Sequence, residues 1–141
     1  METLHLLEES EIQLINNSWT VISKSKKSVR NTFYSNIFEV DPKLESLFRE
    51  SFLAWDSLPD SFEFMYKHME NLENVTLEIK RLGLKHKTFG VKPKTFAIGK
   101  DALVKTIDQY MGKDYTEELG NAWAKLFEYM AHYMILGIKK K

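Results

Sequence analysis

The sequence predicts an all-α domain, and three features of the chain support this prediction. Apolar residues recur at helical spacing along nearly all of the 141 residues, and strict alternation of apolar and polar residues is rare. Glycine and proline are scarce, with six and three residues, and no segment has the composition of a linker. With 43% apolar residues, a chain of this length is expected to bury one core as a single domain over residues 1–141.

The first two helices are predicted from apolar stripes with steps of three and four residues. Residues 8–23 form the first stripe, whose inward members are Ile12, Ile15, Trp19 and Ile22. Residues 26–40 form the second, whose inward members are Val29, Phe33, Ile37 and Val40. Asp41 and Pro42 then begin a short third helix, because aspartate caps a helix N-terminus well and proline suits the first helical position. This helix is expected to continue to Phe48.

The middle of the chain carries two further helical stripes. From about residue 51 to 70 the period is kept by Leu58, Phe62, Met65, Met69 and Leu72. Pro59 interrupts this period, because a proline inside a helix removes one backbone hydrogen bond and clashes one turn back. Either the helix kinks there or it begins near Pro59. Asn71 can cap the next helix, whose stripe consists of Val75, Ile79, Leu82 and His86.

Two longer helices are expected to close the chain. One covers about residues 93–111 and ends at Gly112, and its inward residues are Phe96, Leu103, Ile107 and Tyr110. The last is capped by Thr116, and its core positions are Trp123, Phe127, Met130 and Met134. Seven or so helices with short joints are expected to pack as crossed helices around one core, and not as an up-down bundle of four.

The composition argues against several classes of function. The 20 basic residues balance the 20 acidic residues, so no bulk charge favours nucleic acid. The absence of cysteine excludes disulfides, thiolate zinc sites, iron–sulfur clusters and cysteine nucleophiles, and it fits a reducing cytoplasm. The first residues have neither a basic region nor a long apolar run. We therefore expect a cytoplasmic protein without a signal peptide or a membrane span.

His86 differs from the other three histidines, because it continues an apolar stripe at the last turn of its predicted helix. An imidazole that faces a core at a helix end is either hydrogen-bonded packing or a metal ligand. No second ligand lies one helical turn away, which disfavours a zinc or di-iron site. A single neutral imidazole in apolar surroundings suits haem, because the porphyrin supplies four of the iron's ligands.

The residues around His86 resemble the proximal motif of the globin family. The segment Leu82–Val91 is similar to the part of single-domain bacterial and neuroglobin-like globins in which a histidine binds iron. Phe96 follows His86 by ten residues, where these globins keep an aromatic side chain facing the haem. The resemblance extends over nearly the whole chain, since Trp19 and Trp123 also fall where the family often has core tryptophans. It implies a globin fold of seven to eight helices that cross around a haem pocket.

The segments before the middle helices resemble the distal half of a globin. The Asp41–Pro42 pair, followed by Phe48, resembles the globin proline and the phenylalanine that stacks on haem. Tyr34 precedes Phe48 by fourteen residues, where many bacterial globins place a distal tyrosine. The usual position of the distal histidine or glutamine falls on Ala54, or on Trp55 if the register shifts by one. This is a departure from the family's pattern.

The resemblance implies haem b, iron protoporphyrin IX, as the cofactor. It makes His86 the iron ligand, Tyr34 a hydrogen-bond donor to a bound gas, and Lys85 a partner of a haem propionate. The apolar residues that it places around the haem are Phe48, Leu58, Leu82, Val91 and Phe96. Each residue also has a simpler interpretation: the apolar residues as ordinary core, Lys85 as solvated, and Tyr34 as bonded to a backbone carbonyl.

Three functions are compatible with this pattern. The first is a haem protein that reversibly binds O2, CO and NO, for O2 transport or sensing, and is not an enzyme. The second is an NO dioxygenase, which needs electrons from a separate reductase. The third is a haem-free globin that acts as an interaction module. The expected partners are diatomic gases, without nucleic acid or membrane, and the expected assembly is a monomer or weak homodimer.

Overall fold

The computed structural model describes residues 7–45, 66–69, 77, 79–80 and 94–139. Its long helices are α1 (Glu9–Ile22), α2 (Lys26–Val40), α7 (Thr95–Met111) and α8 (Glu117–Lys139). Two short 3-10 turns, η1 (Ser23–Ser25) and η3 (Gly112–Asp114), join α1 to α2 and α7 to α8. The described residues contain no strand, which confirms the predicted all-α class.

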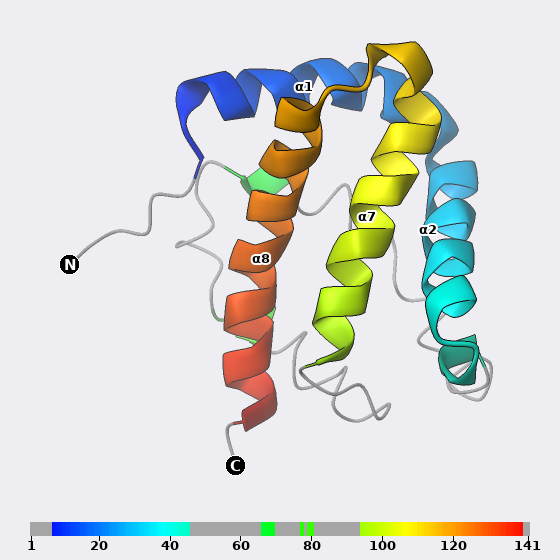
Figure 1. Cartoon of the computed structure of the whole chain (residues 1–141). Coiled ribbons are helices and arrows are strands. Elements are labelled where there is room, and N and C mark those ends of the chain that lie inside the picture. The colour runs from blue at the N-terminus through cyan, green and yellow to red at the C-terminus, as the bar shows by residue number, and fades with distance from the viewer. Residues whose placement is uncertain (1–6, 46–65, 70–76, 78, 81–93, 140–141) are drawn as a thin grey trace.

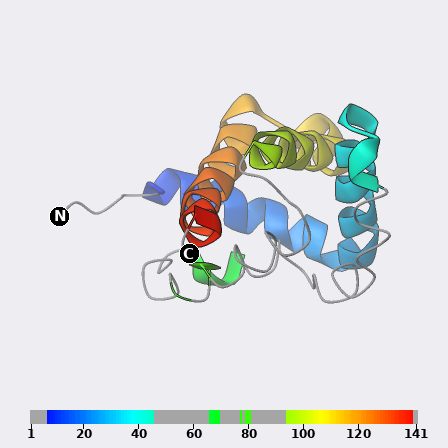
Figure 2. The same ribbon diagram turned by 90° about the horizontal axis from the view of Figure 1, so that it is seen from below.

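The long helices pack as crossed elements. Helix α7 lies between α2 and α8, and α1 runs across one end of all three (Figure 1). The view from below looks onto the opposite end, where α2 ends and α7 begins (Figure 2). The prediction of crossed helices around a core is confirmed. None of the helices in the described ranges is both long and apolar enough to cross a membrane.

The ends of the helices follow the local signals in the sequence. Helix α2 has the predicted bounds, and α7 ends at Gly112, which adopts a positive φ of 56°. The Thr116 hydroxyl accepts a hydrogen bond from the Leu119 backbone N–H at 3.1 Å and so caps α8. After α2, the Asp41 carboxylate accepts a hydrogen bond from the Lys43 backbone N–H at 3.2 Å, and residues 43–45 are helical. The remainder of that short helix, up to Phe48, lies outside the described residues.

The core is an apolar cluster supplied by every long helix. Most members of the predicted stripes in α1, α2, α7 and α8 are buried, whereas Ile12, Trp19 and Tyr110 are partly buried and pack against the core. The fully enclosed members include Ile15, Ile22, Leu103, Ile107 and Trp123. One inward prediction is wrong, because Val40 is 62% exposed. Val40 is the last residue of α2, where the apolar stripe of the helix ends.

A buried polar pair joins α1 to α8. The Trp123 indole N–H donates to the Ser18 hydroxyl at 2.9 Å, and this hydroxyl donates to the Ile15 carbonyl at 3.0 Å. Ser18 is 1% exposed and Trp123 is fully buried. Water therefore cannot replace either bond, and the Ser18 oxygen is the hydrogen-bond acceptor of the buried indole N–H.

Replacing Ser18 by alanine should lower the free energy of unfolding by about 1–3 kcal/mol, because the buried indole N–H would be left without its acceptor. Thr20→Ala is a matched control, since the Thr20 hydroxyl makes the same kind of bond, to the Asn17 carbonyl, on the exposed side of α1. Urea unfolding of the two variants measures the difference. Equal stability losses would show that the Trp123–Ser18 bond contributes nothing of its own.

Candidate functional site

The predicted site residues divide into those that the structure describes and those that it does not. Tyr34 and Phe96 are described. The others lie outside the described residues, and their roles stay predictions: His86, Phe48, Leu58, Leu82, Lys85, Val91, Ala54 and Trp55.

Tyr34 is buried in an aromatic environment on α2. Its side chain is 4% exposed. Its ring centroid lies 5.3 Å from that of Phe33, at an interplanar angle of 55°, and 6.3 Å from that of Phe38, at 19°. Phe38 follows Tyr34 by one helical turn, so the helix itself brings the two rings together. A phenol in such surroundings can direct one strong hydrogen bond, because little water competes for it.

Phe96 enters the core from the first turn of α7. It is 8% exposed and belongs to the same apolar cluster as Tyr34. Both residues come from elements that meet at one end of the molecule, since α2 ends where α7 begins (Figure 1). Both residues therefore lie in the apolar core of the molecule.

The helix stripe that precedes His86 is buried where the structure describes it. Ile79 is fully buried, and Met69, from the preceding stripe, is 4% exposed. Because Ile79 precedes His86 by seven residues, two helical turns, the two would share a face of a continuous helix. The burial of Ile79 supports an inward direction for that face.

These described residues fit a haem. A porphyrin has two apolar faces, and it needs an apolar lining with few polar groups. Tyr34 and Phe96 offer aromatic surface with a single phenol hydroxyl. In the parts of the chain that the structure describes, no three His, Cys, Asp or Glu side chains gather as a metal site of their own.

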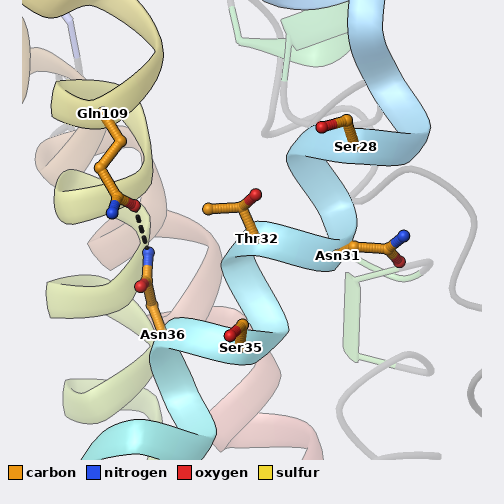
Figure 3. A pocket seen from close by; sticks show the side chains of 6 residues that line it. All are labelled: Ser28, Asn31, Thr32, Ser35, Asn36 and Gln109. Atoms are coloured by element: carbon orange, nitrogen blue, oxygen red, sulfur yellow. Dashed lines mark hydrogen bonds between the residues drawn. The ribbon is translucent and has the colours of Figure 1, made fainter.

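The sequence prediction missed a polar network between α2 and α7. The Asn36 side-chain amide donates to the Thr106 hydroxyl at 3.0 Å. It also donates to the Gln109 side-chain oxygen at 2.9 Å (Figure 3). Thr106 in turn donates to the Ala102 carbonyl at 2.7 Å. Polar residues 70 or more positions apart give no sequence signal of pairing, and Asn36 lies beside the apolar stripe of α2.

An open polar hollow lies beside this network on the outer side of α2 and α7. It is lined by Ser28, Asn31, Thr32, Ser35, Asn36 and Gln109 (Figure 3). Both amide hydrogens of Asn36 are already used within the protein. Neither hydrogen is left to hold a ligand in the hollow, and the other lining side chains are exposed or partly buried.

Comparison with known proteins points to one family. The family model described as Globin matches residues 31–134. Neuroglobin from Danio rerio is 28% identical over 149 aligned residues, which cover 95% of this chain and 94% of that protein.

Solved structures agree with the sequence comparison. A bacterial globin from Campylobacter jejuni superposes with a TM-score of 0.76 at 24% identity, over 94% of this chain and 96% of that chain. An engineered carbene transferase from Rhodothermus marinus, named as a candidate nitric oxide dioxygenase, superposes with a TM-score of 0.80 at 25% identity. That match covers 94% of this chain and 93% of the other.

Proposed function

This chain belongs to the globin family and is a haem-binding globin, and from that premise we propose that it reversibly binds O2 at haem b held by His86. When bound, the haem supplies an iron that coordinates diatomic gases, which include CO and NO as well as O2. The protein supplies the iron ligand, the apolar surroundings and the polar contact that selects among gases.

The observation that carries this proposal is the buried phenol of Tyr34. It is 4% exposed and lies among aromatic rings on α2. We assign its hydroxyl the role of hydrogen-bond donor to the gas ligand. Such a donor favours O2 over CO, because O2 carries more negative charge when it is bound. Ala54 and Trp55 mark the segment where a globin usually has its distal histidine or glutamine, and Ala54 has no donor to offer.

The remaining predicted residues complete the site. We assign the lining of the haem to Phe48, Leu58, Leu82, Val91 and Phe96, of which Phe96 is seen to be buried. Their role is to exclude water from the haem, because a dry pocket slows oxidation of the ferrous iron. Lys85 is assigned to a haem propionate, where a positive charge offsets the carboxylate.

Spectroscopy of the purified protein tests the proposal. We expect a strong Soret band, and reversible shifts of the ferrous spectrum when O2 or CO is added and removed. A colourless protein that cannot take up added hemin would overturn the O2 proposal and favour an interaction module.

NO detoxification is a second candidate function, favoured by the similarity to the Rhodothermus marinus protein. In that reaction NO and O2 combine with one electron to give nitrate, so a separate reductase must supply the electron. Rapid, catalytic NO consumption that depends on an added reductase would support this function. Consumption that stops after one turnover per haem would favour O2 transport or sensing.

The cellular compartment, the assembly and the partners of the protein are also part of the proposal. We propose a cytoplasmic protein that acts as a monomer or weak homodimer, with diatomic gases as its partners and without nucleic acid. The equal numbers of acidic and basic residues support the last point.

A further inference from the structure

Helix α2 buries one broad face, and the two edges of this face differ in chemistry. Tyr34 and Phe38 lie on one side, among aromatic rings. Asn36 lies on the other side and faces α7 (Figure 3). Successive residues of a helix are about 100° apart, so two positions that differ by two residues point in nearly opposite directions. Any roll of α2 about its axis therefore moves Tyr34 and Asn36 together.

Asn36 is the most protected polar contact between α2 and α7. It is 6% exposed, and both of its amide hydrogens are donated, to the fully buried Thr106 and to Gln109. Because Thr106 donates its own hydrogen to the Ala102 carbonyl, its oxygen is oriented to accept from Asn36. A roll of α2 would break two directed bonds in a place that water does not reach.

The other polar contacts along this interface are more exposed. At one end the Tyr110 hydroxyl bonds to the hydroxyls of Ser28 and Thr32. At the other end Lys105 donates to Glu39 at 2.8 Å, and this bond and the lysine's charge lower the pKa of Glu39. The Lys105 and Glu39 side chains are 51% and 68% exposed, and such surface pairs hold a helix weakly. Among the described polar contacts of this interface, those of Asn36 therefore resist a roll of α2 most strongly.

We propose that Asn36, held by Thr106 and Gln109, is a positioning residue that fixes the rotation of α2 and thereby aims the Tyr34 hydroxyl at the gas ligand. This inference rests on the role proposed above for Tyr34. A small roll of α2 would displace the Tyr34 hydroxyl considerably, because an atom about 9 Å from a helix axis moves about 1.5 Å when the helix rolls by about 10°. A hydrogen bond tolerates a donor–acceptor range of only about half an ångström.

The test uses the haem-loaded protein and near-isosteric substitutions. In Asn36→Leu we expect O2 to dissociate about three- to ten-fold faster, with little change for CO. Thr106→Val should act in the same direction but more weakly, since Gln109 still holds the amide. Thr106→Ser keeps the accepting hydroxyl and should restore the wild-type rate. If Asn36→Leu fails to fold, the comparison of O2 release in Thr106→Val and Thr106→Ser tests the positioning role by itself.

Two controls separate positioning from general loss of packing. Ser18→Ala removes a buried hydrogen bond between α1 and α8, remote from α2, and should leave O2 release unchanged. In a Tyr34→Phe background, Asn36→Leu should change O2 release by less than about two-fold, because the hydroxyl that it positions is gone.

A structural measurement complements the rates. In the CO complex of Asn36→Leu we expect a shifted C–O stretching band, whereas Ser18→Ala should keep the wild-type band. The NMR contact between the Tyr34 and Phe38 rings lies within α2 and should persist in both variants, which shows that the helix itself stays folded. Unchanged O2 release in Asn36→Leu, or an equal change with and without the Tyr34 hydroxyl, would overturn the positioning role. If Tyr34→Phe itself leaves O2 release unchanged, then the assignment of Tyr34 fails first, and the role of Asn36 fails with it.

Discussion

Replacing His86 by alanine should leave the protein almost without bound haem. The proposal gives the iron one protein ligand. It assigns the Tyr34 hydroxyl to the gas ligand and only apolar side chains to the haem lining, so none of these replaces the lost bond. Removal of residues that only support a metal ligand weakens metal sites by about 10- to 100-fold. Loss of the ligand itself should exceed that, and the ratio of Soret to protein absorbance measures it.

Two comparisons make the His86 result specific. His132→Ala removes an exposed histidine on α8 and should keep full haem content. Added imidazole should restore haem to His86→Ala, because the free base can enter the space that the side chain leaves. Full haem content with an unchanged ferrous spectrum in His86→Ala would refute the assignment of the iron ligand.

Replacing Tyr34 by phenylalanine should speed O2 release by about ten- to a hundred-fold. The substitution keeps the buried aromatic ring and removes the hydroxyl alone. A hydrogen bond to a charged acceptor contributes about 1.5–3 kcal/mol, and each 1.4 kcal/mol corresponds to a factor of ten in rate. CO carries less charge when it is bound, so its release should change much less. Stopped-flow ligand release measures both rates.

The control for Tyr34 is a second tyrosine that lies in another part of the fold. Tyr133→Phe removes a hydroxyl from α8, where the ring packs edge-on against Tyr129, and should leave both rates unchanged. Equal O2 release from wild type and Tyr34→Phe would show that Tyr34 is not the donor. Trp55 would be examined next, because an indole N–H can also donate.

Sequence spacing and the resemblance to globins predict the site only as far as local patterns allow. The apolar stripe of its helix predicts that Phe96 faces the interior, and the resemblance to globins predicts the same of Tyr34. Both residues are buried in one apolar cluster. The burial of Ile79 agrees with the stripe that ends at His86. His86 itself stays a prediction, together with the other site residues that lie outside the described ranges.

Local signals in the sequence predict the long helices and most of their ends. The bounds of α2, the termination of α7 at Gly112 and the Thr116 cap of α8 all follow from local signals. Helical periodicity and capping are readable because they arise from contacts between residues within about four positions of each other.

The tertiary structure alone decided which residues meet between helices. Asn36 pairs with Thr106 across 70 positions, and Trp123 pairs with Ser18 across 105. It also left Val40 in solvent, although Val40 continues an apolar stripe. These outcomes depend on where two helices cross and on how each is rotated about its axis. Many side chains distributed along both helices set that geometry together, so no local pattern encodes it.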